Sequence, residues 1–486
     1  MPSPVVGAGL AIVLLCLVVA GLWLVWRRPF LGLGVLVAGM AFHNFVLMVL
    51  LALRTPPLLI RIVQGWKELV LALLVALAIT RLLPMRSQWN WRRLIAMDWI
   101  AIAFTAVLIV YLLLPSSLVP ASANFVQRVL AFRTASLIPL IYFLARVFSR
   151  PQDRDLEHVG WLIVGAGAVV GAFGLYELWF VPTAQWLDWG VNLYSSWLGF
   201  TYNGPAGLPE NFFQSLPDGL LLRRMVSTYI SPLGIAYTGL VAWPIAVAML
   251  NRPQPSRRIA LVTSVTAGFL LIGMLFSVTR LALLMLAGES LLLFLVLRTK
   301  TVLGLGVLVV ACVTAILFLY PSVGPTVDPS LLPGESHRRT ILYIGDPSFA
   351  EHLRALIGDL RFISRHLLGT GLGGSVNRFI QTGASGTTGE SALLGFFGDV
   401  GVVGGILFLA LYGLSLYYGQ RAVRVASPRS LRLALPLVAS VGGLVLLPIA
   451  LTSDVWADFS VSFLYWWAAG YSASIALRSD SEMGPH

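Results

Sequence analysis

Isolated ionisable residues at the ends of long apolar segments are the features of this sequence best suited to chemistry. Glu390 lies where a polar loop meets an apolar segment. Arg224 precedes another apolar segment, and Arg280 lies between two more. An ionisable side chain at the edge of a bilayer is costly, and its default interpretation is functional. One carboxylate and several guanidinium groups suit chemistry on an anionic, lipid-linked substrate.

Arginine is suited to bind phosphate groups, since its planar guanidinium pairs with two phosphate oxygens and stays charged near lipid. Arg280 is the first candidate for this task because it lies in an otherwise apolar hairpin. Arg224 is the second candidate, and Arg223 beside it is not distinguished from it. The alternative is that these side chains only reach lipid headgroups or anchor helix ends. Weaker candidates for binding the same phosphate groups are Arg338, Arg339 and Arg378.

Glu390 is suited to accept a proton from a hydroxyl group as a general base. The alternative is an ordinary glutamate at a helix N-terminus, where the macrodipole favours it. Asp399 lies further along the same expected helix and is expected to face the bundle. Alternative proton carriers are His337, His352 and His366, although lone histidines in such loops are more often surface or capping residues.

The composition is that of a polytopic membrane protein. Of 486 residues, 58% are hydrophobic and 11% are charged, whereas about a quarter of the residues in a soluble protein are charged. The net charge of +12 comes from basic residues scattered at the ends of apolar segments, which indicates membrane topology and not nucleic-acid binding. Cys16 and Cys312 lie in apolar segments, which favours buried thiols over a disulfide or a metal pair.

Apolar segments of about 18 to 25 residues predict an all-α bundle of about 12 to 13 transmembrane helices, forming a single integral membrane domain over residues 1–480. The predicted spans are 6–26, 30–53, 57–80, 97–115, 125–149, 159–180, 226–250, 259–279, 281–297, 302–320, 391–418, 433–452 and 456–477. Arginine-rich loops alternate along the chain and are predicted to be cytoplasmic. The loops 181–225 and 321–390 are then outside, together with Arg224, Arg280 and Glu390.

The two outer loops have different patterns. Aromatic residues are frequent in 181–222, which favours packing at the level of the lipid headgroups over a sugar-stacking surface. In 349–368, apolar residues recur at helical spacing with charged residues between them. This pattern predicts an amphipathic helix that lies on the membrane or caps the bundle. The glycines of 371–389 indicate a sharp turn and not a nucleotide-binding loop, because no Lys-Ser/Thr pair follows them.

Three segments together resemble the superfamily of O-antigen ligases and Wzy-type polysaccharide polymerases. They are RMVSTYISP at 224–232, SVTR at 277–280 with Leu284, and HLLGTGLG at 366–373 followed by Glu390-Ser391 and the pair Gly401 and Gly404. The resemblance covers residues 220–420. In the ligases the last motif begins with histidine. Glu390 stands in that place here, which favours a polymerase over a ligase.

The resemblance implies a glycosyltransferase of the bacterial plasma (inner) membrane, with its active site on the periplasmic or outer face. It would transfer a glycan from undecaprenyl diphosphate to a lipid-linked acceptor, with inversion and without a metal or other cofactor. Arg280 and Arg224 would bind the diphosphate, and Glu390 would deprotonate the acceptor. The expected partners are the lipid-linked glycan, membrane lipids and a chain-length regulator protein, with no nucleic acid. The alternatives are an O-antigen ligase that uses lipid A core or another surface acceptor, and a lipid or glycan transporter.

Overall fold

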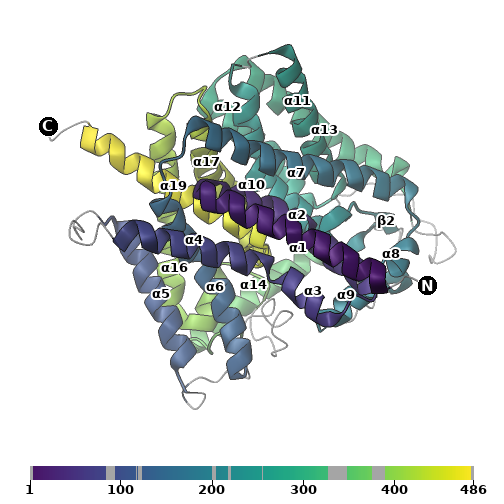
Figure 1. Ribbon diagram of the computed structural model, residues 1–486, viewed down its shortest axis with the longest axis horizontal. Coiled ribbons are helices and arrows are strands. Elements are labelled where there is room, and N and C mark those ends of the chain that lie inside the picture. The colour runs from purple at the N-terminus through teal and green to yellow at the C-terminus, as the bar shows by residue number, and fades with distance from the viewer. Residues whose placement is uncertain are drawn as a thin grey trace. The chain divides into compact units, whose positions relative to one another are not determined.

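The computed structural model describes residues 4–83, 94–115, 118, 123–199, 204–216, 221–253, 256–326, 347–374 and 389–482. Nearly all regular structure in these residues is helical (Figure 1). Eleven of the described helices are long and apolar enough to cross a membrane, and a bent pair, α3 (Pro57–Gln64) and α4 (Trp66–Leu82), makes up to twelve. The chain is therefore a multi-pass membrane protein with an all-α fold, as its composition predicts.

The contacts divide the chain into two compact units. Unit 1 comprises Met1–Leu77, Pro151–Ile344 and Pro428–Ala434, and unit 2 comprises Ala78–Arg150, Gly345–Ser427 and Leu435–His486. The long helices of unit 1 are α1 (Pro4–Arg27), α2 (Gly32–Ala52), α7 (Asp153–Phe180), α10 (Pro232–Asn251), α11 (Arg257–Phe276), α12 (Arg280–Leu297) and α13 (Lys300–Val323). Those of unit 2 are α5 (Ala96–Leu113), α6 (Phe125–Val147), α14 (Pro347–Arg365), α16 (Leu394–Val425), α18 (Gly443–Thr452) and α19 (Phe459–Glu482).

Side-chain caps fix where several of these helices begin. Ser231 accepts a hydrogen bond from the Gly234 N–H and is followed by Pro232 at the first helical position of α10. Thr299 caps α13 in the same way through the N–H of Val302. The span predicted over 226–250 therefore begins six residues later, at Pro232.

In unit 1, α7 packs along α11, α2 and α10 (Figure 1). The loop after α7 folds into two short helices, α8 (Gln185–Asp188) and α9 (Val191–Trp197), and a hairpin of β1 (Phe213–Ser215) and β2 (Leu221–Arg223). In the hairpin Phe213 pairs with Arg223. Trp186 and Phe212 from this loop are buried in a cluster with Leu47 and Met48 of α2. These aromatic side chains thus form part of the protein core. The sequence pattern had instead predicted that the aromatic residues of this loop pack at the level of the lipid headgroups.

In unit 2, α16 packs against α5 and α19, and α19 packs along α6. Two buried charges in this unit have local partners. Asp98 accepts hydrogen bonds from Tyr142 and Arg146, and Arg128 donates to the main-chain oxygens of Tyr111 and Leu114 where α5 ends. These ionisable residues therefore have structural contacts within the bundle.

Two predicted spans of unit 2 differ from the observed helices. The helix predicted over 391–418 begins at Leu394 and is interrupted at Val400 and Gly401, whose backbone angles are not helical. The segment predicted over 456–477 forms α19, which is almost wholly buried but is not among the eleven membrane-crossing candidates. Its tryptophan, tyrosine and serine residues lower its mean hydropathy. The amphipathic helix predicted over 349–368 is confirmed as α14.

Candidate functional site

The segment that carries Arg224 is held by hydrogen bonds to three neighbouring segments, one of which is the end of α11, where the Met225 N–H donates to the Phe276 oxygen at 2.9 Å. The Arg223 N–H donates to the Pro325 oxygen at 2.8 Å, and the Arg224 N–H donates to the Phe212 oxygen at 2.9 Å. The hydroxyl of Tyr320 donates to the Arg223 oxygen at 2.7 Å. This turn therefore lies at the end of unit 1 where α7, α11 and α13 end and α12 begins.

The side chain of Arg224 is buried and turned toward the hairpin between α11 and α12. Its Nε donates to the Ser277 oxygen and one terminal nitrogen donates to Thr279 Oγ1, both at 2.8 Å. Burial lowers the pKa of Arg224 to about 10, and the charge of Arg280 acts in the same direction against the opposing effect of Tyr237. The guanidinium therefore stays protonated at neutral pH, at a cost in desolvation.

The backbone around Arg224 is strained. Ser227, Ile230 and Val278 all have positive φ angles, of 43°, 55° and 51°. Such conformations are outliers for β-branched residues and cost about 1–3 kcal/mol each. Strain of this kind persists only where surrounding contacts over-determine the backbone, and it clusters at functional sites. The strain marks this turn as the best candidate for a site in unit 1.

Arg280 is the first residue of α12, immediately after Thr279. A cation at a helix N-terminus is disfavoured by the macrodipole, whereas an anion is favoured there. Arg224 donates to Thr279, the residue directly before Arg280, so the two arginines belong to the same hairpin region. Two guanidinium groups and a helix N-terminus thus combine into one region of positive potential. The structure brings together the two arginines that the sequence placed in separate motifs.

Arg223 has a different environment. Its guanidinium forms a buried ion pair with Glu177 of α7 at 3.2 Å and donates to the Val181 oxygen at 2.8 Å. Its predicted role as a diphosphate ligand stays a prediction, while the observed contacts make it a structural partner of Glu177. Sequence reasoning did not single out Glu177, although a glutamate in an apolar segment was a signal that could have identified it.

In unit 2, Glu390 lies in front of α16 and not within its first turn. The Leu394 N–H donates to the Ser391 hydroxyl at 3.1 Å, and Glu390 lies just before this first turn, where the macrodipole still favours a carboxylate. The Glu390 side chain is about half exposed, at 52%. His352 of α14 lies beside it, with Nδ1 3.9 Å from Glu390 Oε2. The structure therefore places one of the alternative proton carriers next to the predicted base.

Asp359 of α14 is a further carboxylate that sequence reasoning did not identify as part of this site. It is 3% exposed and accepts a hydrogen bond from the Gly389 N–H. Burial raises the pKa of Asp359, and the Gly389 bond opposes that shift. A Cβ at position 389 would lie 2.9 Å from an Asp359 oxygen, so glycine permits the close approach. Asp359 thus fixes the peptide that precedes Glu390.

The glycine motifs of the sequence pack against each other at the break in α16. The N–H groups of Thr370 and Gly371 donate to the oxygens of Gly398 and Asp399 at 2.8 and 2.9 Å, and the Val402 N–H donates to the Leu367 oxygen. The break lets the main chain of α16 bind the 367–371 loop in place of continuing its own helix. Asp399 is fully buried at this break, consistent with the expectation that it faces the bundle.

The remaining candidates are placed as follows. The Nδ1 of His366 lies 3.1 Å from the oxygen of Phe362, on whose ring it stacks. It is thus packed on the end of its own helix, as a capping residue. Arg338, Arg339, Arg378 and His337 lie outside the described residues, and their predicted roles stay predictions.

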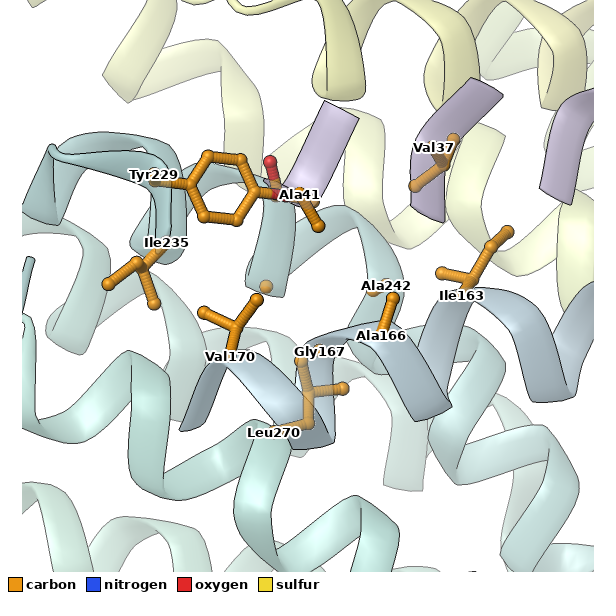
Figure 2. Close-up of a pocket in the computed structure, with 12 residues that line it drawn as sticks. Val37, Ala41, Ile163, Ala166, Gly167, Val170, Tyr229, Ile235, Ala242 and Leu270 are labelled. Carbon is orange, nitrogen blue, oxygen red and sulfur yellow. The ribbon is translucent and has the colours of Figure 1, made fainter. Parts of the chain in front are cut away.

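An apolar pocket in unit 1 lies apart from the charged groups. Figure 2 shows it lined by aliphatic side chains such as Val170 and Leu270, with Tyr229 at one end and Val37 at the other. Its polar lining in the described chain is Tyr229 and Thr238. Neither Arg224 nor Arg280 lines it, so this pocket suits an apolar group and does not serve as the anion site.

Comparison of the chain with models of known protein families and with curated proteins finds no match. The two groups of residues, one in each unit, are therefore the features of the chain from which a function can be inferred.

Proposed function

We propose that the chain is a polysaccharide polymerase of the bacterial plasma membrane, which elongates a glycan carried on undecaprenyl diphosphate. The observation that carries the proposal is the cationic turn of unit 1. There the buried Arg224 donates to Thr279, and Arg280 follows Thr279 at the N-terminus of α12, which gives one region of positive potential. Like charges at short range repel strongly in a medium of low dielectric constant, so an anion that shares the region would relieve the repulsion.

A diphosphate fits this region better than a single carboxylate. Arginine pairs with two phosphate oxygens at once, and the free N–H groups at a helix N-terminus bind the same oxygens. The region lies at the ends of candidate membrane-crossing helices, where a lipid-linked diphosphate would reach it from the bilayer. Arg280 and Arg224 would therefore stabilise the charge that builds up on the leaving diphosphate.

The second requirement is a base for the acceptor hydroxyl, and the family resemblance assigns this task to Glu390. The hydroxyl oxygen attacks the anomeric carbon, Glu390 accepts its proton, and the bond from that carbon to the diphosphate oxygen breaks. The bonding electron pair leaves with the diphosphate, and the anomeric configuration inverts. The partial exposure of Glu390 and its proximity to His352 support this assignment. This route has no step that needs a metal ion or a nucleotide sugar.

The test is turnover by the purified full-length protein in nanodiscs, with undecaprenyl-diphosphate-linked glycan, EDTA and no nucleotide sugar. We expect a ladder of lengthening glycans that is lost in Glu390→Gln and in Arg280→Ala. Arg258→Ala is the matched control, since Arg258 is exposed at the beginning of α11, and it should retain the ladder.

Each other outcome points to a specific alternative. A single transfer to added lipid A core or protein would identify a ligase. A ladder that persists in Glu390→Gln would remove Glu390 as the base but keep the reaction. Movement of the donor between leaflets without any turnover would identify a transporter and overturn the proposal.

A further inference from the structure

Glu177 is the most highly coordinated buried carboxylate near the cationic turn. It lies near the C-terminal end of α7 and is 1% exposed. Oε1 accepts hydrogen bonds from Arg223 and from the indole N–H of Trp186, both at 3.2 Å. Oε2 accepts from the main-chain N–H groups of Val226 and Ser227, both at 3.4 Å. All four contacts are donors to the carboxylate, which matches its ionised form.

These donors lie on both sides of Arg224 in the sequence. Arg223 precedes it, and Val226 and Ser227 follow it within the strained part of the turn. Arg223 also donates to the main-chain oxygens of Glu177 and Val181, which binds the turn to the end of α7 a second time. One carboxylate thus holds both ends of the 223–227 segment, which contains Arg224.

We infer that Glu177 is a positioning residue for the diphosphate site, holding the 223–227 turn so that the Arg224 guanidinium is presented to the anion beside the N-terminus of α12. This inference rests on the proposed function. Glu177 would then contribute to binding of the lipid-linked glycan without touching it. The effect of Glu177 is transmitted through the Arg223 side chain and through the peptides that follow Arg224.

Glutamine in place of Glu177 conserves shape but not hydrogen bonding. The glutamine amide has one oxygen and one NH₂ group. In either orientation of the amide, the NH₂ group would face N–H donors instead of an acceptor. One side of the turn would therefore lose its acceptor, and the main chain that carries Arg224 would shift relative to α7. A displacement of about 1 Å in a binding group is enough to cost about 100-fold in rate, so the effect should be measurable.

The experiment uses the full-length protein in nanodiscs and measures binding of a short polyprenyl diphosphate, with polyprenyl monophosphate for comparison. The variants are Glu177→Gln, Arg224→Ala, the double variant, and Glu210→Gln as a control at an exposed position of the same loop. For Glu177→Gln we expect Kd for the diphosphate to rise about tenfold or more, and kcat/KM for the glycan donor to fall by at least the same factor, because Arg224 also stabilises the leaving group. Glu210→Gln should match the wild type.

The double variant separates positioning from general stability. If Glu177 acts through Arg224, adding Glu177→Gln to Arg224→Ala should leave Kd unchanged from Arg224→Ala alone. The effect of Glu177→Gln on thermal unfolding should be the same in the wild type and in the Arg224→Ala variant. An unchanged Kd in Glu177→Gln, with a raised Kd in Arg224→Ala, would overturn the positioning role and leave the proposed function intact. A wild type that binds no diphosphate would overturn both.

A second variant covers the case in which Glu177→Gln does not fold. Trp186→Phe keeps a buried aromatic ring and removes one of the four donors to Glu177. We expect a smaller rise in Kd, about two- to fivefold, since the other three donors remain. A Kd equal to that of the wild type would contradict the inference.

Discussion

Arg224 is a buried cation whose hydrogen bonds go to neutral acceptors, the Ser277 oxygen and Thr279 Oγ1. Arg223, the adjacent residue of the same type, is instead neutralised by Glu177. This difference decides which of two neighbouring arginines is suited to bind an anion. A guanidinium in a neutral cage retains its electrostatic attraction for a phosphate, whereas one bound to a carboxylate has largely lost it.

The cage around Arg224 makes a prediction for Thr279, which is 7% exposed. Thr279→Val removes the acceptor of an Arg224 N–H and should destabilise the protein by about 1–3 kcal/mol, the cost of a buried donor without a partner. The donor KM should rise as well. Thermal unfolding in detergent and steady-state kinetics measure the two effects.

Thr279→Ser is the matched control, because serine at the position before α12 retains the hydroxyl group that accepts the Arg224 hydrogen bond. It should behave like the wild type in both measurements. A Thr279→Val variant with wild-type stability and KM would show that this hydrogen bond does not hold Arg224.

At the scale of the elements, the break in α16 is the feature that organises the glycine motifs of unit 2. Gly401 has φ 70° and ψ −177°, a conformation essentially restricted to glycine. A Cβ there would lie 2.7 Å from the carbonyl carbon of Leu368. The break therefore needs glycine for two reasons, its backbone angles and its contact with the 367–371 loop.

Gly401→Ala should consequently destabilise the protein by more than about 2 kcal/mol, since backbone strain and a clash with the main chain add together. Gly413→Ala in the same helix is the control, because a Cβ at 413 meets no atom within 4 Å. This control should be neutral or more stable by about 0.5–1 kcal/mol. Equal thermal unfolding of the two variants would contradict the role of Gly401.

At the scale of the whole molecule, alternating arginine-rich loops predict the side of the membrane on which each candidate residue lies. The prediction is that residues 181–225 face the outside and the loop near Arg429 faces the cytoplasm. Single cysteines introduced by Glu210→Cys and Arg429→Cys test it, since both positions are exposed. The background is Cys16→Ala and Cys312→Ala, which removes both native thiols.

In right-side-out membrane vesicles, a membrane-impermeant maleimide should label the Glu210→Cys variant at once. It should label the Arg429→Cys variant only after permeabilisation. The opposite pattern would invert the topology and place Arg224 on the cytoplasmic side, which would exclude a reaction on the outer leaflet.

The course of the chain through the membrane was predictable from sequence because a backbone in lipid must satisfy its own hydrogen bonds. Long apolar segments therefore become helices whatever their neighbours are, and the predicted spans overlap α1, α2, α5, α6, α7 and α10 to α13. The charge of the candidate residues and their place at span ends also follow from the sequence. The helix break at Gly401 was not evident, since the glycine spacing alone does not show which loop the break binds.

Only the tertiary structure decided which charges pair and which do not. Glu177 and Arg223 are 46 residues apart, and their ion pair forms because the turn after β2 packs on the end of α7. Likewise, Asp359 meets Gly389 because α14 lies against the segment before α16. The energy of a buried charge depends on the partners within a few ångströms, and helix packing determines those partners. The sequence alone thus determines which residue types can do chemistry. Helix packing determines that Arg223 is paired with a carboxylate, whereas Arg224 has neutral acceptors and is suited to bind an anion.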